Sequence, residues 1–265
     1  MVKTVVVPLD GSDHAETALG TARWLAEAFD ADLLLFTSTF ALDPAEDEQY
    51  LHRVISARDL PRASVEVAAG RSAGPAVVNA RRGSPNSIVC MATHGRTGLR
   101  AVVLGSVADE VVRDLGDPVV LIGPSFEPGS GARELLVCWD GSEVSATIGP
   151  IAAAWAAALD LEPRVLAVRA DGEPSVLTEA SGAPLPATDA LVATLGAGDR
   201  PVQLTELVDA DPAGAIAEYA ASFPVALVAL ATQGRSGIAS SALGRVAAKI
   251  VNRSPRPLLV HHPRG

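Results

Sequence analysis

The chain has 265 residues, about the length of two ordinary domains, and 48% of them are hydrophobic, enough to bury a substantial core. A net charge of −10 and a pI near 4.9 argue against nonspecific binding to nucleic acid or to an anionic membrane. No signal-like segment begins the sequence and no run of about twenty apolar residues occurs, so we expect a cytoplasmic protein that does not enter membranes. Cys90 and Cys138 lie in apolar runs, which favours buried reduced thiols over a disulfide.

The first half of the chain alternates strand-like and helix-like segments. Its first apolar run leads into the turn Asp10-Gly11, and Asp13 and Glu16 then have the spacing of a capping box at a helix start. This alternation predicts a parallel, doubly wound sheet with right-handed crossovers. The predicted strands are Val2 to Leu9, Ala31 to Ser38, Ser64 to Ala69, Ser87 to Met91 and Pro118 to Ile122; the predicted helices start at Asp13, Pro44, Ala73 and Val107.

The second half repeats this order after a linker, Pro124 to Ala132, that is rich in Pro, Gly and Ser. It is longer than the first half, and the extra residues fall in Asp171 to Arg200, where we expect a loop and a short helix near Ala187 to Leu195. We therefore predict two tandem doubly wound domains, residues 1–126 and 132–265. Each is expected to be an open five-stranded parallel sheet flanked by helices.

One stretch of each half stands out because it occurs twice. Residues 92–113 read A-T-H-G-R-T-G-L-R-A-V-V-L-G-S-V-A-D-E-V-V-R, and residues 231–253 read A-T-Q-G-R-S-G-I-A-S-S-A-L-G-R-V-A-A-K-I-V-N-R. Each stretch follows an apolar strand-like run and ends in a pattern of helical period. At one constant offset, Ala92, Gly95, Gly98, Leu104 and Gly105 match Ala231, Gly234, Gly237, Leu243 and Gly244. The chain therefore contains an internal duplication.

The repeated stretch has the features of an anion site. Gly105 and Ser106 fall at the predicted N-terminus of a helix, where backbone N–H groups and the positive end of the helix dipole attract negative charge. Glycine lets a phosphate approach the backbone closely, and the Ser106 hydroxyl adds a donor. A strand, a glycine-bearing loop and a helix start, in that order, suit a bound phosphate.

With these motifs the sequence resembles the universal stress protein family in its tandem two-domain form, over nearly its whole length. The family's nucleotide-binding signature is glycine, two residues, glycine, nine residues, glycine, and then serine or threonine. The first half matches it with Ala92 in place of the first glycine, then Gly95, Gly105 and Ser106. The resemblance implies the Rossmann-like fold of the adenine nucleotide alpha hydrolases, with ATP as ligand and magnesium as counter-ion of the phosphates.

The resemblance also implies where the ligand contacts the chain. In nucleotide-binding members an aspartate at the end of the first strand contacts the adenine or ribose side, and Asp10 and Asp140 match it. The family's sheet order places the first and fourth strands side by side at the point where strand order reverses, and ligands bind in that crevice. The implied nucleotide-binding residues are Pro8, Asp10, Ser38, Met91, Ala92, Gly95, Arg96, Gly105, Ser106 and Val107 in the first half, and Asp140, Ala231, Gly234, Arg235, Gly244 and Arg245 in the second.

Three positions depart from the family pattern. Ala92 adds a methyl group where the signature has glycine. Ser38 stands after the second strand, where many members have an apolar residue that packs on adenine. Arg245 stands where the hydroxyl residue belongs, and its guanidinium either pairs with a phosphate or fills the pocket with its bulk. We expect weaker or altered binding in the second half.

Several of these residues also allow simpler interpretations. His94 lies in the loop, but the second half has Gln233 there, so a shared catalytic histidine is not expected. Arg96 and Arg235 either neutralise phosphate or are solvated, and Asp10 either contacts the ligand or caps the first helix. His261 and His262 are interpreted as a strand end, because adjacent strand residues face opposite ways.

The absent motifs limit the enzyme classes. The sequence has no Walker P-loop, no G-x-G-x-x-G, no nucleophile elbow and no cysteine–histidine metal spacing. The resemblance implies, as the favoured function, an ATP-binding stress-response regulator whose two domains pack as an internal pseudo-dimer, and whether two chains pair further stays open. Two alternatives are a nucleotide-free interaction protein and a slow ATP hydrolase that uses Asp10 or His94.

Overall fold

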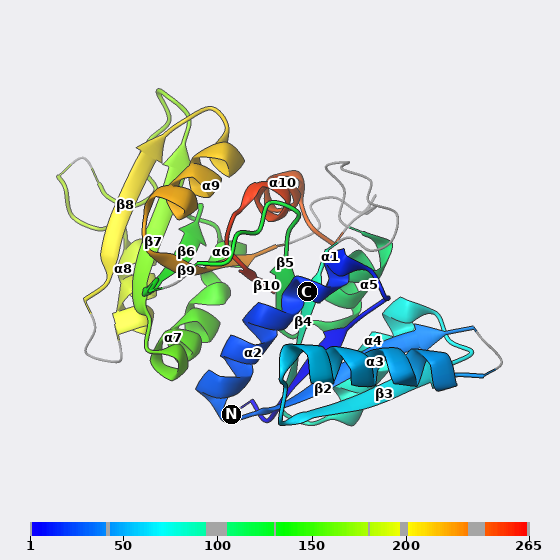
Figure 1. Ribbon diagram of the computed structural model, residues 1–265. Helices are drawn as coiled ribbons and strands as arrows, with labels where there is room; N and C mark the ends of the chain where they lie inside the picture. The colour runs from blue at the N-terminus through cyan, green and yellow to red at the C-terminus, as the bar shows by residue number, and fades with distance from the viewer. Residues whose placement is uncertain are drawn as a thin grey trace.

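The computed structural model describes residues 2–40, 43–93, 105–129, 131–179, 181–196, 201–232 and 242–263. In these ranges the strands form one ten-stranded sheet in the order β3-β2-β1-β4-β5-β10-β9-β6-β7-β8 (Figure 1). The strands are β1 (Thr4–Pro8), β2 (Asp32–Thr39), β3 (Ala63–Ala69), β4 (Ser87–Ala92), β5 (Val119–Ile122), β6 (Glu134–Trp139), β7 (Glu162–Arg169), β8 (Gln203–Val208), β9 (Val225–Ala231) and β10 (Leu258–His261).

The helices alternate with these strands, which confirms the predicted α/β order. None of the helices in the described ranges is long and apolar enough to cross a bilayer. The helices are α1 (Asp13–Glu16), α2 (Ala18–Phe29), α3 (Ala45–Arg58), α4 (Ala73–Gly83), α5 (Ser106–Leu115), α6 (Glu143–Ala146), α7 (Ile148–Leu159), α8 (Pro186–Leu195), α9 (Pro212–Ser222) and α10 (Arg245–Arg253).

Helices cover both faces of the sheet, so the strands are apolar on both sides. Val5 and Val7 of β1 point to the face that packs against α2, α3, α7 and α8. Val6 points to the opposite face, which packs against α4, α5, α9 and α10. Alternate strand residues face opposite ways, so a parallel sheet between two helix layers needs the continuous apolar runs seen in the sequence.

The two halves of the chain join through one antiparallel strand pair. Leu258, Leu259 and Val260 of β10 pair with Leu121, Val120 and Val119 of β5, whereas the neighbouring strands within each half are parallel. The strand order is consequently the same when it is counted from either edge, as expected for two halves related by an approximate two-fold axis. Figure 1 shows the halves side by side, with α2 and α7 adjacent. The predicted pseudo-dimer is thus a single continuous sheet.

One local prediction is wrong and one strand is confirmed. The cap of the first helix is Ser12, whose hydroxyl accepts a hydrogen bond from the Ala15 amide at 3.1 Å, so Asp13 and Glu16 form no capping box. Ser38 lies within β2, as the predicted strand from Ala31 to Ser38 has it, and its backbone is in register with Ala68 of β3.

Two further predictions are confirmed. The insertion of the second half contains the short helix α8, which begins with a proline at its first position, where the missing N–H costs nothing. Cys90 and Cys138 are both free thiols. Burial raises the pKa of Cys90 far above its ordinary value and raises that of Cys138 to about 12. Neither thiol therefore ionises appreciably at neutral pH.

Gly123 supplies a test of the junction between the halves. It follows β5, and a Cβ atom at this position would overlap the backbone carbonyl oxygen of Val251 in α10. Gly123→Ala should lower the free energy of unfolding by about 1–3 kcal/mol, because a backbone atom cannot move aside cheaply. Urea denaturation measures this change.

Gly20→Ala is the matched control. Nothing lies within 4 Å of a Cβ placed on Gly20, which is in the first turn of α2. Its replacement should raise the free energy of unfolding by about 0.5–1 kcal/mol, because alanine is the better helix former. Equal stability of the Gly123→Ala chain and the unsubstituted chain would show that the junction tolerates a side chain.

Candidate functional site

The first candidate site lies where the strand order of the first half reverses. β1 pairs with both β2 and β4, and Val6 of β1 is in register with Val89 of β4. Both strands are parallel, so the turn after Pro8 and the residues after Ala92 leave the sheet at the same edge. The second half repeats this arrangement, with Val137 of β6 in register with Ala229 of β9. Ligands of open α/β sheets bind at such an edge.

Asp10 and Asp140 have the same local role in the two halves. Asp10 Oδ1 accepts hydrogen bonds from the Ser12 amide at 3.0 Å and from the Ser12 hydroxyl at 2.6 Å. Asp140 Oδ1 accepts the corresponding bonds from Ser142 at the same distances. Each serine in turn caps the following helix, so each aspartate orients a helix cap. The capping role weighed from the sequence is present, and a ligand contact of either carboxylate stays a prediction.

The strand-end residues of the first site differ in burial. Met91 and Ala92 are 4% and 7% exposed, and Met91 belongs to the apolar cluster beneath α4 and α5. Pro8 and Ser38 are half-buried at the ends of β1 and β2. These four residues come from three adjacent strands, so the sheet brings them to one edge as the sequence predicted.

The helix start of the first site is organised by Gly105. Gly105 is the N-cap of α5, and its amide donates a hydrogen bond to the Thr93 carbonyl oxygen at 2.9 Å. This bond links the two residues that flank the first glycine loop. Helix geometry leaves the amides of Ser106 and Val107 without partners inside the helix, and the Ser106 side chain is exposed. The backbone donors that this helix start offers are therefore those of the first helical turn.

The helix start of the second site is held differently. Gly244 is the N-cap of α10, but its amide donates to the Thr232 hydroxyl at 3.1 Å and not to a carbonyl. The Thr232 hydroxyl donates to the Ala242 carbonyl oxygen at 3.3 Å. The side chain of Arg245, the first helical residue, is exposed. Thus the structure gives no support to the hypothesis that Arg245 packs into the site.

Asp109 was not identified from the sequence. It lies in the first turn of α5, is 9% exposed, and accepts a hydrogen bond from the Ala242 amide of the second half at 2.6 Å. Its other oxygen is 3.1 Å from Nη1 of Arg113. Ala248 occupies the equivalent position of the second repeat, so the duplication gave no signal for this residue.

The threonine before each glycine loop was also missed, although the repeat contained a signal for it. Thr93 and Thr232 are 1% and 4% exposed and occur at equivalent positions of the two copies. Their amides donate to the carbonyl oxygens of Ile122 and His261 at 3.0 and 2.8 Å. A polar residue that is identical in both copies and follows an apolar strand was the available indication.

His261 and His262 contact Thr232 at the base of the second site. Nδ1 of His262 is 3.0 Å from the Thr232 carbonyl oxygen. Burial and the charge of His262 lower the pKa of His261, with Asp117 opposing them. His261 is therefore neutral at pH 7 and contributes no charge to an anion site. No group of three or more His, Cys, Asp or Glu suited to a metal occurs in the described ranges.

The remaining predicted residues lie outside the described part of the chain. They are His94, Gly95, Arg96, Gln233, Gly234 and Arg235. Ala231, the last residue of β9, is half-buried at the base of the second loop. The described residues therefore define the base and the helix start of each loop.

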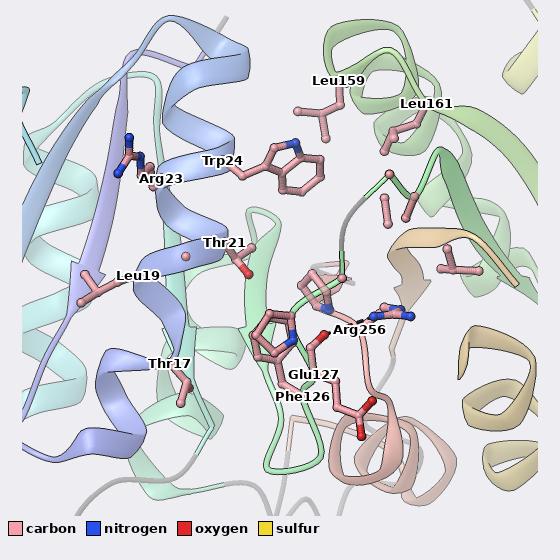
Figure 2. Close-up of a pocket in the computed structure, with 18 of the residues that line it drawn as sticks. Thr17, Leu19, Thr21, Arg23, Trp24, Phe126, Glu127, Leu159, Leu161 and Arg256 are labelled. Atoms are coloured by element: carbon pink, nitrogen blue, oxygen red, sulfur yellow. Dashed lines mark hydrogen bonds between the residues drawn. The ribbon is translucent and has the colours of Figure 1, made fainter. Parts of the chain in front are cut away.

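A separate cavity of about 870 Å³ lies between the halves (Figure 2). Trp24 points into it from α2 toward the side of Leu159 and Leu161, and Phe126 enters from the linker. Arg256 donates to the carbonyl oxygens of Ala220 and Glu127 at 3.3 and 3.2 Å, so its guanidinium connects the linker to α9. Among the residues that the structure describes, none of the predicted nucleotide-binding ones lines this cavity.

Comparisons with known proteins identify the family. The model of the universal stress protein family matches residues 1–123 and again residues 131–262. A Thermus aquaticus protein named "universal stress protein in QAH/OAS sulfhydrylase 3'region" is 29% identical over 140 residues, which cover 46% of this chain and 99% of the relative.

A solved structure with a TM-score above 0.7 shows the same fold. A universal stress protein of Archaeoglobus fulgidus covers 99% of this chain and 98% of its own, with a TM-score of 0.72 at 18% identity. A universal stress protein in complex with cAMP covers 51% of this chain and 100% of its own, with 26% identity and a TM-score of 0.41. The family match spans both halves, and the chain therefore belongs to the universal stress protein family, in a tandem two-domain form.

Proposed function

We propose that this chain is an ATP-binding stress-response regulator. Nucleotide bound at the first glycine loop changes the conformation of a surface to which a partner protein binds. The observation that carries the proposal is that the Asp10 turn and the exposed Ser106 helix start follow two adjacent parallel strands, β1 and β4, at the reversal of strand order. A carboxylate and a helix N-terminus at one sheet edge suit the two ends of a nucleotide, because the ribose offers hydroxyl donors and the phosphates carry the negative charge.

Each residue has a separate role in this proposal. Asp10 contacts the adenine or ribose side, and the amides of Ser106 and Val107 with the Ser106 hydroxyl hold phosphate oxygens. Arg96 adds countercharge from the loop. Magnesium would accompany the phosphates as their counter-ion, with phosphate oxygens and water as ligands.

The second site is proposed to bind nucleotide more weakly than the first. The exposed Arg245 replaces a hydroxyl donor at the helix start, and the Gly244 amide is held by Thr232. A guanidinium can attract phosphate, but its length keeps the charge away from the amides of the first turn. Occupancy near one nucleotide per chain is the expected consequence.

A nucleotide-free interaction protein is the second candidate. The Gly105 amide bonds to Thr93 and Asp10 bonds to Ser12, so both groups have partners within the chain. Under this candidate the two sites are structural remnants and the loops serve only as contact surfaces. Binding measurements separate the two candidates directly.

The first prediction concerns nucleotide that copurifies with the protein. Freshly purified chain, denatured and analysed by chromatography, should release about one adenine nucleotide per chain, because only the first site retains the hydroxyl residue. Titration with ATP, ADP and cAMP tests the stripped protein; cAMP is included because one universal stress protein has been solved in complex with it. No released nucleotide together with no binding of any of the three would favour the nucleotide-free candidate.

Gly105→Val tests the first helix start. The φ and ψ angles of Gly105, −58° and 146°, are allowed for any residue, so valine adds bulk without backbone strain. It should weaken ATP binding at the first site on the order of 100-fold, as expected from the loss of two charge-assisted hydrogen bonds. Gly105→Ala, which adds a single methyl group, is the matched control. Unchanged affinity in a folded Gly105→Val chain would remove this helix start from the site.

Arg245→Ser tests the asymmetry of the halves. The substitution restores the signature hydroxyl, and the stoichiometry measured by titration should rise from about one ATP per chain toward two. Ser106→Arg makes the opposite change at the first site and should lower its affinity. A stoichiometry that stays at one for Arg245→Ser would show that another feature weakens the second site.

A further inference from the structure

Asp109 links the two halves at the candidate sites. It is on α5, three residues after Ser106, and so lies close to the first helix start. Its side chain is largely buried, and Oδ1 accepts a hydrogen bond of 2.6 Å from the Ala242 amide. A bond of this length from an amide to a carboxylate is charge-assisted, and such bonds are the stronger ones in proteins.

Ala242 belongs to the end of the second glycine loop. It precedes Gly244, the N-cap of α10, by two residues. Its carbonyl oxygen accepts from the Thr232 hydroxyl at 3.3 Å, and the same hydroxyl accepts from the Gly244 amide at 3.1 Å. Thr232 thus holds the segment from within the second half, while Asp109 holds it from the first half.

The equivalent residue of the second repeat cannot make the same contact. Gly105 and Asp109 are four residues apart in the first repeat, and Gly244 and Ala248 are four residues apart in the second. Alanine has no acceptor on its side chain, so α10 cannot return the contact to the first loop through this position. The first loop instead closes on its own half, through the hydrogen bond from the Gly105 amide to Thr93.

We propose that Asp109 is a positioning residue for the second glycine loop and couples nucleotide binding at the two sites. This inference rests on the proposed function, because it assigns the coupling to nucleotide at each loop. Nucleotide held at Ser106 acts on the same helical turns that present Asp109 to Ala242. By linkage, a second nucleotide held at the Gly244 loop changes affinity at the first site by the same factor.

The charge of Asp109 gives a competing expectation. A carboxylate close to an anion site repels phosphate, and removing it would then strengthen second-site binding. Arg113 lies 3.1 Å from the other oxygen of Asp109 and offsets that charge. The positioning role therefore predicts weaker second-site binding when the side chain is removed, and repulsion predicts the opposite.

The experiment compares four full-length chains: the unsubstituted chain, Asp109→Ala, Asp109→Asn and the control Asp114→Ala. Asparagine keeps an acceptor for the Ala242 amide but lacks the charge. Asp114 is a half-exposed aspartate of the same helix whose side chain pairs with Arg113 at 3.4 Å, so its removal changes the helix charge equally. Hydrogen exchange of residues 242–244 is measured without nucleotide, and ATP titration measures both sites.

For Asp109→Ala we expect exchange at the Ala242 amide to be about 10-fold faster, and second-site affinity to fall about 10-fold with loss of coupling. Asp109→Asn should keep exchange at the Ala242 amide and second-site affinity close to those of the unsubstituted chain, and Asp114→Ala should change neither. If Asp109→Ala does not fold, Asp109→Ser, whose side chain is shorter than aspartate but polar, replaces it in the comparison.

Three further results would decide between the positioning role, charge repulsion and the absence of nucleotide binding. Unchanged exchange at residues 242–244 in a folded Asp109→Ala chain would overturn the positioning role. Tighter second-site binding in both Asp109→Ala and Asp109→Asn would overturn it in favour of charge repulsion. Faster exchange in Asp109→Ala, with no nucleotide bound by any of the chains, would support the positioning role and reject the proposed function.

Discussion

The antiparallel pairing of β5 with β10 is the contact on which the rest of the structure depends. Three residue pairs, from Leu121–Leu258 to Val119–Val260, join two five-stranded halves into one sheet. Without this pairing each half would expose the backbone of an apolar edge strand, which is costly and prone to aggregate. The pairing also brings α5 and α10 to the same face of the sheet, so that Asp109 of one half reaches Ala242 of the other.

The duplication kept the framework of the site and changed its details. Both halves have an aspartate that orients a capping serine, a buried threonine before the loop, and a glycine that caps the following helix. The differences lie in the helical residues after the glycine: Ser106 with Asp109 in the first half, and Arg245 with Ala248 in the second. The first half therefore keeps the hydroxyl residue of the signature, and the second half receives from its neighbour an acceptor for the Ala242 amide.

The framework follows from local sequence patterns and is therefore largely predictable. Apolar runs of strand length, helical periodicity from Val107 to Leu115 and glycines at a constant offset predicted the element order, the two halves and the helix starts. Where prediction failed, a neighbouring group decided the outcome. Asp13 was expected to form a capping box with Glu16, but the Ser12 hydroxyl accepts the hydrogen bond from the Ala15 amide. The Gly105 amide lies at the expected helix start, and the sequence did not show that the Thr93 carbonyl oxygen accepts its hydrogen bond.

The sequence by itself determined the α/β fold, the duplication and the residue types at each loop, because hydrophobic period and glycine spacing act over a few residues and are visible in the chain. Only the tertiary structure decided that the halves share one sheet and that Asp109 contacts the second loop. Both depend on which strand edges meet and in which register. Asp109 and Ala242 are 133 positions apart in the chain, and no periodic pattern connects residues at such a separation.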